Sequence, residues 1–213
     1  KEYLKKLNIK APIHLTTTKV NDQLIDGVPE KSITVIKSIL FLARIEKNKG
    51  IFISIDAFQI LIKKHPELQF QIVGRGNALN EAKEYVKSKS IPNIMFTGPL
   101  SGEELTKEFR NAELYILPTT HGEGMPTSVL EAMAFGLPVI TRPVGGLVDF
   151  FENDKMGYMI ESLNAEEYAE KIEILITNVE KARQISSNNA KYAREHFMAS
   201  TVAKHLEDKL SEL

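Results

Sequence analysis

Cysteine is absent from this 213-residue sequence, which excludes disulfide bonds and thiolate metal sites and suits a reducing compartment such as the cytoplasm. No apolar run approaches the roughly 20 residues of a membrane-spanning helix, and no signal peptide is visible. A strong charge of either sign is also missing. The formal net charge is −1, so the sequence predicts no strong attraction to nucleic acid or to a membrane surface.

An initial methionine is missing too. The sequence opens with KEYLKKLNIK, which is typical of a helix already under way. A fragment of a longer protein and a trimmed or tagged N-terminus are equally good interpretations. The 43% hydrophobic and 26% charged residues are ordinary for a globular protein, and the length allows one large domain or two small ones.

Short apolar runs alternate with amphipathic stretches over most of the chain. Ile51, Ile55, Phe58 and Ile62 share one helical face, Ser101 and Glu104 form a capping-box pattern at a helix start, and Gly136 ends a further helix. The expected strands cover residues 38–44, 68–73, 93–98, 113–119, 137–141 and 157–161. The expected helices lie between them and from about residue 164 onward.

This alternation predicts an α/β fold, with a parallel sheet and helices on both faces. Residues 1–37 do not fit the alternation and are interpreted as a connector or small hairpin, followed by one domain over residues 38–213. In such sheets ligands bind beyond the carboxyl ends of the strands. The loops of interest are therefore residues 44–50, 74–77, 97–102, 118–126 and 142–146.

The loop at 44–50 carries two cations, Arg44 after a strand and Lys49 before a helix. A cation is disfavoured at a helix N-terminus unless an anion lies nearby, and both side chains suit phosphate oxygens. Taken alone, two solvated surface charges remain the simpler interpretation. In the loop at 74–77, Gly74 and Gly76 form only a weak dinucleotide pattern, and a tight turn explains most of it.

The loop at 118–126 precedes a helix that is expected to begin near Thr127. The free N–H groups and positive dipole end of such a helix suit a phosphate. Glu123 lies before this start and Glu131 about one turn inside the helix. Ser128 and Glu131 also match a capping box, which would explain Glu131 structurally. Two carboxylates roughly 5–9.5 Å apart would instead suit a glycoside hydrolase.

The remaining polar candidates are weaker. Gly145 and Gly146 indicate either a simple turn or a backbone close to a ligand, with equal weight. His121 is more typical of a loop residue than of a catalytic base. No His, Asp and Glu cluster has metal-ligand spacing, and no Ser–His–Asp arrangement has a nucleophile-elbow context. No metal site is therefore predicted.

In combination, the segments FLARIEKNKG, QIVGRG, IMFTG, ILPTTHGEGMPTSVLEAMAFGLPVI and GG resemble the nucleotide-sugar-binding domain of GT-B glycosyltransferases. The resemblance is to family 4, the retaining glycosyl transferases group 1, and covers about residues 38–197. It implies a Rossmann-like half of a GT-B fold. A second such domain, upstream, would then be missing, and the final helices would cross back toward it.

The resemblance also implies roles for particular residues. Arg44 and Lys49 look like the pair that neutralises the donor diphosphate. Glu123 looks like the carboxylate that contacts the donor sugar, and Glu131 like the one that binds the ribose. The remaining donor-binding positions implied by the family are Gly74, Met95, Gly124, Met125, Thr127 and Ser128.

The resemblance implies a retaining, metal-independent transferase with no cofactor, whose donor is a UDP-, GDP- or ADP-sugar and whose acceptor is a sugar or a lipid-linked molecule. An isolated C-terminal fragment is expected to be inactive. The expected location is the cytoplasm, including the inner face of a membrane, to which the full-length enzyme would bind peripherally. Nucleic acid is not an expected partner.

Two departures from the family pattern concern this site. Pro126 stands where the family often has glycine, so one N–H donor is lost. Asp149 follows the double glycine where the family more often has glutamate. Three other functions stay open: a dinucleotide oxidoreductase, a glycoside hydrolase, and a non-catalytic nucleotide- or partner-binding domain.

Overall fold

The computed structural model describes residues 16–122 and 124–211 and forms a single six-stranded sheet in the order β3-β2-β1-β4-β5-β6. Every pairing is parallel, as the alternation predicts. The order reverses direction between β1 and β4, which is the topological switch point of a doubly wound sheet. The strands are β1 (Ser38–Leu42), β2 (Gln69–Val73), β3 (Ile94–Gly98), β4 (Leu114–Leu117), β5 (Val139–Thr141) and β6 (Gly157–Met159).

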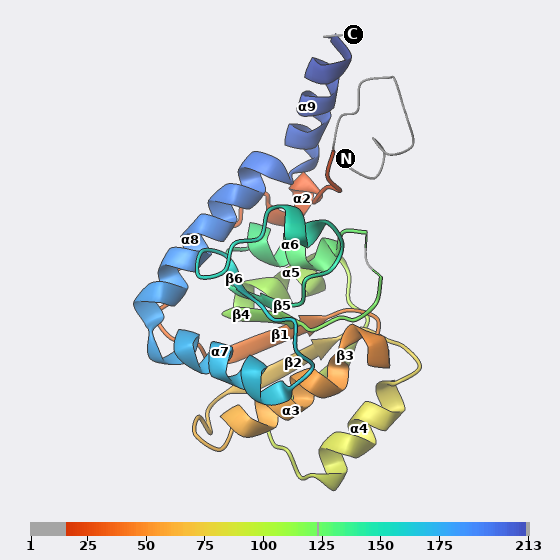
Figure 1. The fold of residues 1–213 in the computed structure, drawn as a ribbon, viewed down its shortest axis with the longest axis vertical. Coiled ribbons are helices and arrows are strands. Elements are labelled where there is room, and N and C mark those ends of the chain that lie inside the picture. Colours follow the sequence, from red (N-terminus) through yellow and green to blue (C-terminus); the bar gives the residue numbers. More distant parts are fainter. Residues whose placement is uncertain (1–15, 123, 212–213) are drawn as a thin grey trace.

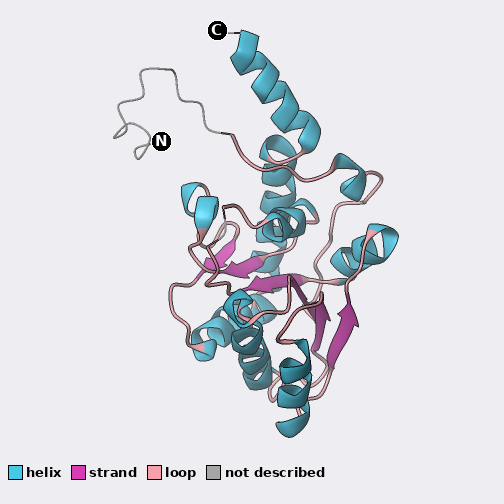
Figure 2. Cartoon of the chain, turned by 90° about the vertical axis from the view of Figure 1, so that its right-hand side faces the viewer, coloured by secondary structure: helices cyan, strands magenta, loops and turns pink. Residues whose placement is uncertain are grey.

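Helices cover both faces of the sheet, so the predicted α/β architecture is confirmed (Figures 1 and 2). On one face α3 packs against α7 and α4, and on the other α6 packs against α8. The bounds are α2 (Asp22–Ile25), α3 (Ile51–Leu61), α4 (Leu79–Ser88), α5 (Gly102–Asn111), α6 (Thr127–Ala134), α7 (Ala165–Thr177), α8 (Val179–His196) and α9 (Ala199–Ser211).

The apolar periodicity of α3 explains why that helix lies flat on the sheet. Ile51, Ile55, Phe58 and Ile62 are all buried, as expected from their shared face. Phe58 stacks on Phe70 of β2, with ring centroids 5.3 Å apart. Burying such side chains contributes roughly 1.5–3 kcal/mol each, which is more than intrinsic helix propensity supplies.

Two details of the predicted helix ends need correction. Ser101 is the N-cap of α5, but its side chain makes no capping hydrogen bond, so that capping box is not formed. Ser128 is not a cap at all, because α6 begins at Thr127 and Pro126 occupies the N-cap. The predicted end of α6 is confirmed, since Gly136 follows the helix with a positive φ of 73°.

The described part of the N-terminal segment, residues 16–37, forms no hairpin. Val20 makes an isolated parallel bridge with Met198, and the Val20 N–H donates to the Phe197 carbonyl at 2.7 Å. The short helix α2 follows, and Ile33 and Ile36 are buried in the core. This part of the chain is therefore packed on the domain through its apolar residues, and its first residues run beside the junction of α8 and α9.

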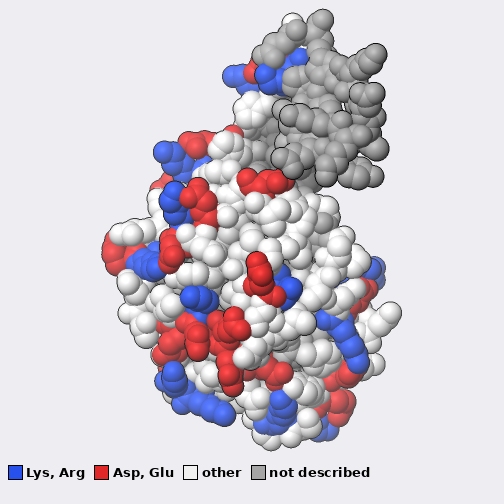
Figure 3. All heavy atoms as spheres, viewed as in Figure 1, with Lys and Arg blue, Asp and Glu red and all other residues white. Residues whose placement is uncertain are grey.

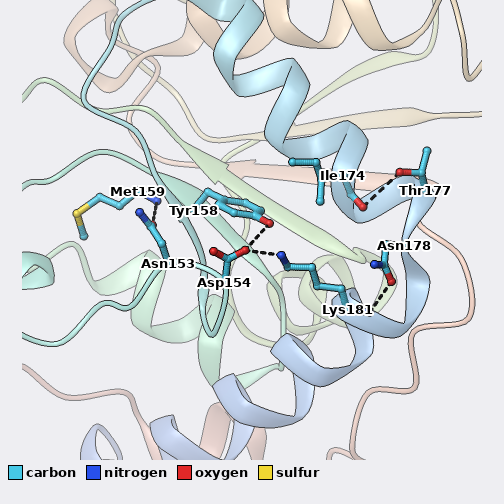
Figure 4. Close-up of polar contacts among 8 residues, drawn as sticks. All are labelled: Asn153, Asp154, Tyr158, Met159, Ile174, Thr177, Asn178 and Lys181. Carbon is cyan, nitrogen blue, oxygen red and sulfur yellow. Dashed lines mark hydrogen bonds and ion pairs between the residues drawn. The ribbon is translucent and has the colours of Figure 1, made fainter.

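Polar contacts fix the C-terminal helices to the edge of the sheet (Figure 4). The Tyr158 hydroxyl donates to Asp154 at 2.9 Å, and Lys181 forms an ion pair with the same carboxylate. The Asn178 side chain caps α8 by accepting from the Lys181 N–H. Deeper in the molecule, buried Asn189 donates to the carbonyls of two neighbouring loops. These contacts hold α8 against the segments that precede β5 and β6.

Charges of both signs are interspersed on the face shown in Figure 3, with acidic side chains gathered over α7. The α7 sequence contains Glu166, Glu167, Glu170 and Glu173. No helix among the described residues is long and apolar enough to span a bilayer.

Candidate functional site

The two segments that follow β1 and β4 lie on either side of the switch point. The first carries the 3-10 helix η1 (Lys47–Lys49) and leads into α3. The second carries residues 118–126 and leads into α6. Because β1 and β4 are hydrogen-bonded neighbours, the topology brings both segments to the same edge of the sheet, where ligands of such folds bind.

Asn48 joins these two segments. Its carbonyl oxygen accepts from the Thr120 N–H at 2.7 Å, the His121 N–H at 3.1 Å and the Thr119 hydroxyl at 3.1 Å. Its side-chain nitrogen lies 3.2 Å from Nδ1 of His121. His121 is therefore part of a loop-to-loop contact, which agrees with the structural role expected from its sequence. The segment that carries Lys49 is thus fixed relative to the segment before α6.

Gly50 allows the backbones of these segments to touch. Its φ is 80°, and a Cβ at this position would lie 2.3 Å from the Pro118 carbonyl oxygen. A side chain therefore meets both backbone strain and a clash with the neighbouring segment. Gly50 is required by the close approach of two parts of the site.

We expect Gly50→Ala to lower the free energy of unfolding by about 2–5 kcal/mol, which combines a left-handed backbone penalty with overpacking. Gly27→Ala is a matched control, because Gly27 also has a positive φ but nothing lies within 4 Å of its Cβ position. That variant should lose only about 1 kcal/mol. Urea unfolding followed by circular dichroism measures both. Equal losses for the two variants would show that the contact with Pro118 is unimportant.

Arg44 and Lys49 occupy different environments within the β1 segment. The Arg44 side chain is 62% exposed and forms an ion pair with Glu46 at 3.0 Å. An exposed pair of this kind contributes only about 0–1 kcal/mol, so the guanidinium is available to a stronger anionic partner. Lys49 is only 6% exposed and lies directly before the start of α3. The site therefore combines an exposed cation with a buried one.

The start of α6 presents the backbone of Thr127 and Ser128 at the same edge of the sheet. The first N–H groups of a helix have no intrahelical acceptors and carry the positive end of the dipole. Pro126 is the N-cap residue, so its missing N–H lies outside the first turn. The N–H groups of Thr127 and Ser128 remain, and the expected loss of one donor to the sugar at Pro126 stays a prediction.

Tyr115 explains what the Ser128 side chain does. The Tyr115 hydroxyl donates to the Leu42 carbonyl at 2.9 Å, and a second hydrogen bond joins it to Oγ of Ser128 at 2.7 Å. The Ser128 hydroxyl is thus used inside the protein, which is why it forms no capping box with Glu131. Any contribution of Ser128 to a ligand would come from its backbone.

Glu131 is partly buried on the second turn of α6, and burial raises the pKa of its carboxyl from 4.5 to about 7. No hydrogen bond or ion pair joins this carboxyl to another described residue. A partly buried acid without donors is costly to ionise unless a ligand supplies them. With the capping-box explanation removed, no contact within the described structure accounts for Glu131, and its expected role as a binding group stays a prediction.

Gly74 and Gly76 are needed for packing. A Cβ on Gly74, whose φ is 139°, would lie 2.0 Å from the Ala43 carbonyl oxygen, and one on Gly76 would lie 2.4 Å from that of Ile45. The turn after β2 therefore runs against the turn after β1. This favours the tight-turn interpretation of the sequence, and it places Gly74 beside the segment that carries Arg44.

The segments after β4 and β5 are joined in the same way. The Gly146 N–H donates to the Gly124 carbonyl at 2.8 Å. A Cβ on Gly146 would lie 2.4 Å from the terminal carbon of Met125. Gly145 and Gly146 begin the 3-10 helix η2 (Gly145–Asp149). Gly124 and Met125 thus border both segments at the carboxyl edge of the sheet.

One predicted site residue stands apart from this assembly. Met95 lies within β3, the outer strand, where it pairs with Gln71 and not with the carboxyl end of β2. Its side chain is 58% exposed, and its proposed place beside a base stays a prediction. Glu123 lies outside the described residues, so its role and its separation from Glu131 stay predictions as well.

Two residues of this assembly, Asn48 and Tyr115, were not predicted from the sequence. Asn48 lies between two lysines, where a polar side chain looks solvent-exposed, and no local pattern indicates bonds to residues 71–73 positions away. The sequence does point to Tyr115, because this residue has the one polar side chain in the otherwise apolar strand LYIL. A buried tyrosine hydroxyl needs a hydrogen-bond partner.

Comparison with known proteins identifies the family. Residues 30–192 match the model of the family described as glycosyl transferases group 1. The chain belongs to this family. Membership selects the glycosyltransferase interpretation over the oxidoreductase and glycoside-hydrolase alternatives.

Individual relatives agree with this assignment. The chain is 30% identical over 154 residues to an uncharacterized glycosyltransferase of Haemophilus influenzae, covering 72% of this chain and 43% of the relative. It is 29% identical over 170 residues to the capsular polysaccharide biosynthesis glycosyltransferase CapM of Staphylococcus aureus, covering 78% and 44%. The chain thus spans less than half the length of these two relatives.

A solved structure shows the same fold. The Anabaena protein HepE, crystallised in complex with UDP and glucose, superimposes with a TM-score of 0.74 at 21% identity, covering 92% of this chain and 54% of that one. At this identity the likeness establishes the fold, which is one half of a GT-B architecture. Within residues 16–122 and 124–211, no group of three or more His, Asp or Glu side chains is arranged to hold a metal ion.

Proposed function

We propose that this chain is the donor-binding part of a retaining glycosyltransferase that takes a UDP-, GDP- or ADP-sugar. The observation that carries the proposal is the convergence of Arg44, Lys49 and the start of α6 at the switch point. Glu131 lies on the same helix, and its carboxyl has no hydrogen-bond or ion-pair partner among the described residues. Two cations and a helix N-terminus suit a diphosphate, and a carboxyl without donors suits a pair of ribose hydroxyls.

Each part has a distinct task in this proposal. Lys49 and Arg44 neutralise the diphosphate, and the N–H groups of Thr127 and Ser128 donate to its oxygens. Glu131 accepts from the ribose hydroxyls, and Glu123 orients the donor sugar. The complex of HepE with UDP and glucose supports this use of the fold, because that protein binds both components of such a donor.

In the transfer step, an acceptor hydroxyl oxygen forms a bond to the anomeric carbon, and the bond from that carbon to the diphosphate oxygen breaks. The nucleoside diphosphate leaves with the electron pair, and the acceptor proton passes to the departing diphosphate or to solvent. The protein cations stabilise the charge that develops on the leaving group, so the proposal requires no metal ion or cofactor.

The rest of the enzyme is part of the proposal. The length of the relatives supports an additional Rossmann-like domain, which would supply acceptor contacts. The fragment alone should therefore not transfer sugar. The exposed apolar side chains Leu206 and Leu210 of α9 suit a contact with that domain. We place transfer to a glycan or lipid-linked acceptor in the cytoplasm, at the inner face of a membrane when the acceptor is lipid-linked.

Calorimetric titration with UDP, GDP and ADP tests the donor site directly. We expect one of the three to bind with a dissociation constant below about 1 mM, because a formed diphosphate site should exceed roughly 4 kcal/mol of binding free energy. The preferred base identifies the donor class. Absence of binding by all three at millimolar concentration would rule out the proposal.

A further inference from the structure

A pocket of about 540 Å³ lies between α3 and α7, the two helices that pack together on one face of the sheet. Its apolar lining consists of Ile60 and Leu61 at the end of α3 and of Ala169 and Ile174 on α7. Ile174 is 37% exposed, although it is a large apolar side chain. We call this pocket the α3–α7 groove. None of its lining residues belongs to the proposed donor site.

Charged side chains form the rim of the α3–α7 groove. Glu166, Glu170 and Glu173 line it from α7. These glutamates are spaced by four and three residues, so they share one side of the helix. Lys64 lines the groove from the segment after α3. The Glu173 carboxylate has partners within the chain, because it lies 2.9 Å from Nε2 of His65 and 3.8 Å from Nζ of Lys64.

The other two glutamates of the rim are not compensated. The carboxylates of Glu166 and Glu170 form no hydrogen bond or ion pair with a described residue. Like charges four residues apart destabilise a helix, so this pair is unfavourable within the chain itself. The dipole of α7 offsets Glu166 in the first turn but not Glu170 in the second. Lys171, the one lysine of α7, lies over the Tyr158 ring at 5.1 Å. The groove therefore combines an apolar floor with negative charge that lacks a partner.

The chemistry of this surface selects an occupant that is apolar on one side and cationic beside it. A small apolar ligand or an uncharged helix would leave the carboxylates unpaired, and an anionic lipid surface would be repelled. The lining extends from Glu166 to Ile174, about 12 Å along α7, which matches two turns of a second helix. An amphipathic helix that lays its apolar face into a hydrophobic groove is a recurring mode of protein recognition.

We propose that the α3–α7 groove docks an amphipathic helix of a partner protein, in which lysine or arginine flanks the apolar face. The apolar side chains of that helix cover Ile60, Ala169 and Ile174, and its cations pair with Glu166 and Glu170. The proposal does not depend on the transferase function, because the groove and the donor site share no residue.

Fluorescence anisotropy with two labelled model peptides tests the groove on the purified protein. Each peptide is an amphipathic helix of about 14 residues, with leucine on one face and either lysine or glutamate on the other. We expect the lysine peptide to bind with a dissociation constant below about 100 μM at low salt and more weakly as salt screens the charges. The glutamate peptide should not bind. In methyl-labelled NMR the signals of Ile60 and Ile174 should shift, whereas that of Ile94 in β3 should not.

Paired substitutions separate the groove from the net charge of the protein. Glu166→Gln combined with Glu170→Gln should weaken binding of the lysine peptide about threefold to thirtyfold, the range expected for two exposed ion pairs. The matched control is Glu104→Gln combined with Glu108→Gln on α5, which removes two carboxylates that are also four residues apart. Because these residues lie outside the lining, the control should change the affinity by less than about twofold.

A second pair of variants tests the apolar floor. Ile174→Ser should weaken binding of the lysine peptide about threefold to tenfold, because the apolar area of Ile174 is no longer covered on binding. Leu163→Ser is the control, since Leu163 is 57% exposed and does not line the groove. Its affinity should equal that of the unmodified protein. Thermal melts check that all variants remain folded, as expected for substitutions at exposed positions.

Three results would overturn the proposal. Equal affinity for the lysine and glutamate peptides would show that the charge of the groove does not select the occupant. Equal weakening by the α7 and α5 double variants would show that the peptide responds only to net charge. Self-association of the chain that displaces the lysine peptide, measured by sedimentation velocity, would identify a second copy as the occupant.

Discussion

Lys49→Ala should weaken nucleoside diphosphate binding by about tenfold to a hundredfold, the loss expected for a charge-assisted hydrogen bond of roughly 1.5–3 kcal/mol. Lys49 is 6% exposed and is the last residue of η1, which lies between β1 and α3. A buried ammonium has a larger effect on an anion than an exposed one, because less water screens it. Calorimetric titration with the preferred nucleotide measures the loss.

The matched control is Lys47→Ala, since Lys47 occupies the same 3-10 helix and removes the same charge. Its side chain is 69% exposed and pairs with Glu81 at 2.7 Å, so we expect a change in affinity below about threefold. A thermal melt of both variants checks that each remains folded. If Lys49→Ala stays folded and binds the nucleotide as tightly as Lys47→Ala does, Lys49 does not contact the diphosphate.

Glu131→Gln should remove a pH dependence from both stability and donor binding. The pKa of this carboxyl is about 7 in the folded protein and close to 4.5 when exposed. The folded state therefore holds the proton more tightly, so this group favours folding at low pH. That contribution is fully present below pH 4.5 and is lost as the pH rises through 7. Its full size is about 3 kcal/mol of unfolding free energy, at roughly 1.4 kcal/mol per unit of pKa difference between the folded and exposed carboxyl.

Urea unfolding between pH 4.5 and 8 measures this effect. The glutamine variant should match the unmodified protein at the acid end and become the more stable of the two as the pH approaches 8. Glu104→Gln, at an exposed position of α5, is the control and should not change the pH profile of unfolding. An unchanged profile in Glu131→Gln would show that burial does not raise the pKa of this carboxyl.

Donor binding should respond to pH in the opposite sense. Ribose hydroxyls donate to the ionised carboxylate, so binding favours loss of the proton and affinity rises as the pH increases through 7. UDP-glucose suits this measurement when uridine is the preferred base, because it has no phosphate that titrates near neutrality. Glu131→Gln should bind the donor at least tenfold more weakly above pH 7.5, with little pH dependence. Equal affinity in the two proteins would remove Glu131 from the ribose site.

Much of the fold follows from local patterns. The six expected strands are all present, and the apolar face of Ile51, Ile55, Phe58 and Ile62 is buried as predicted. Hydrophobic periodicity and turn residues act over a few positions, so a single sequence reports them directly. The helix caps were less predictable, because Ser128 could bond to its own helix or to a distant tyrosine, and the tertiary packing of Tyr115 decided between them.

The amino-acid sequence alone determined the parallel sheet and placed Arg44, Lys49, Glu131 and the start of α6 after the correct strands. The tertiary structure decided how these groups are assembled. The carbonyl of Asn48 fixes one segment to another that is more than 70 positions away. Burial of Lys49 and of Glu131 also depends on distant parts of the chain. The alternation of strands and helices follows from short-range periodicity, whereas desolvation and loop-to-loop hydrogen bonds arise only when remote segments pack together.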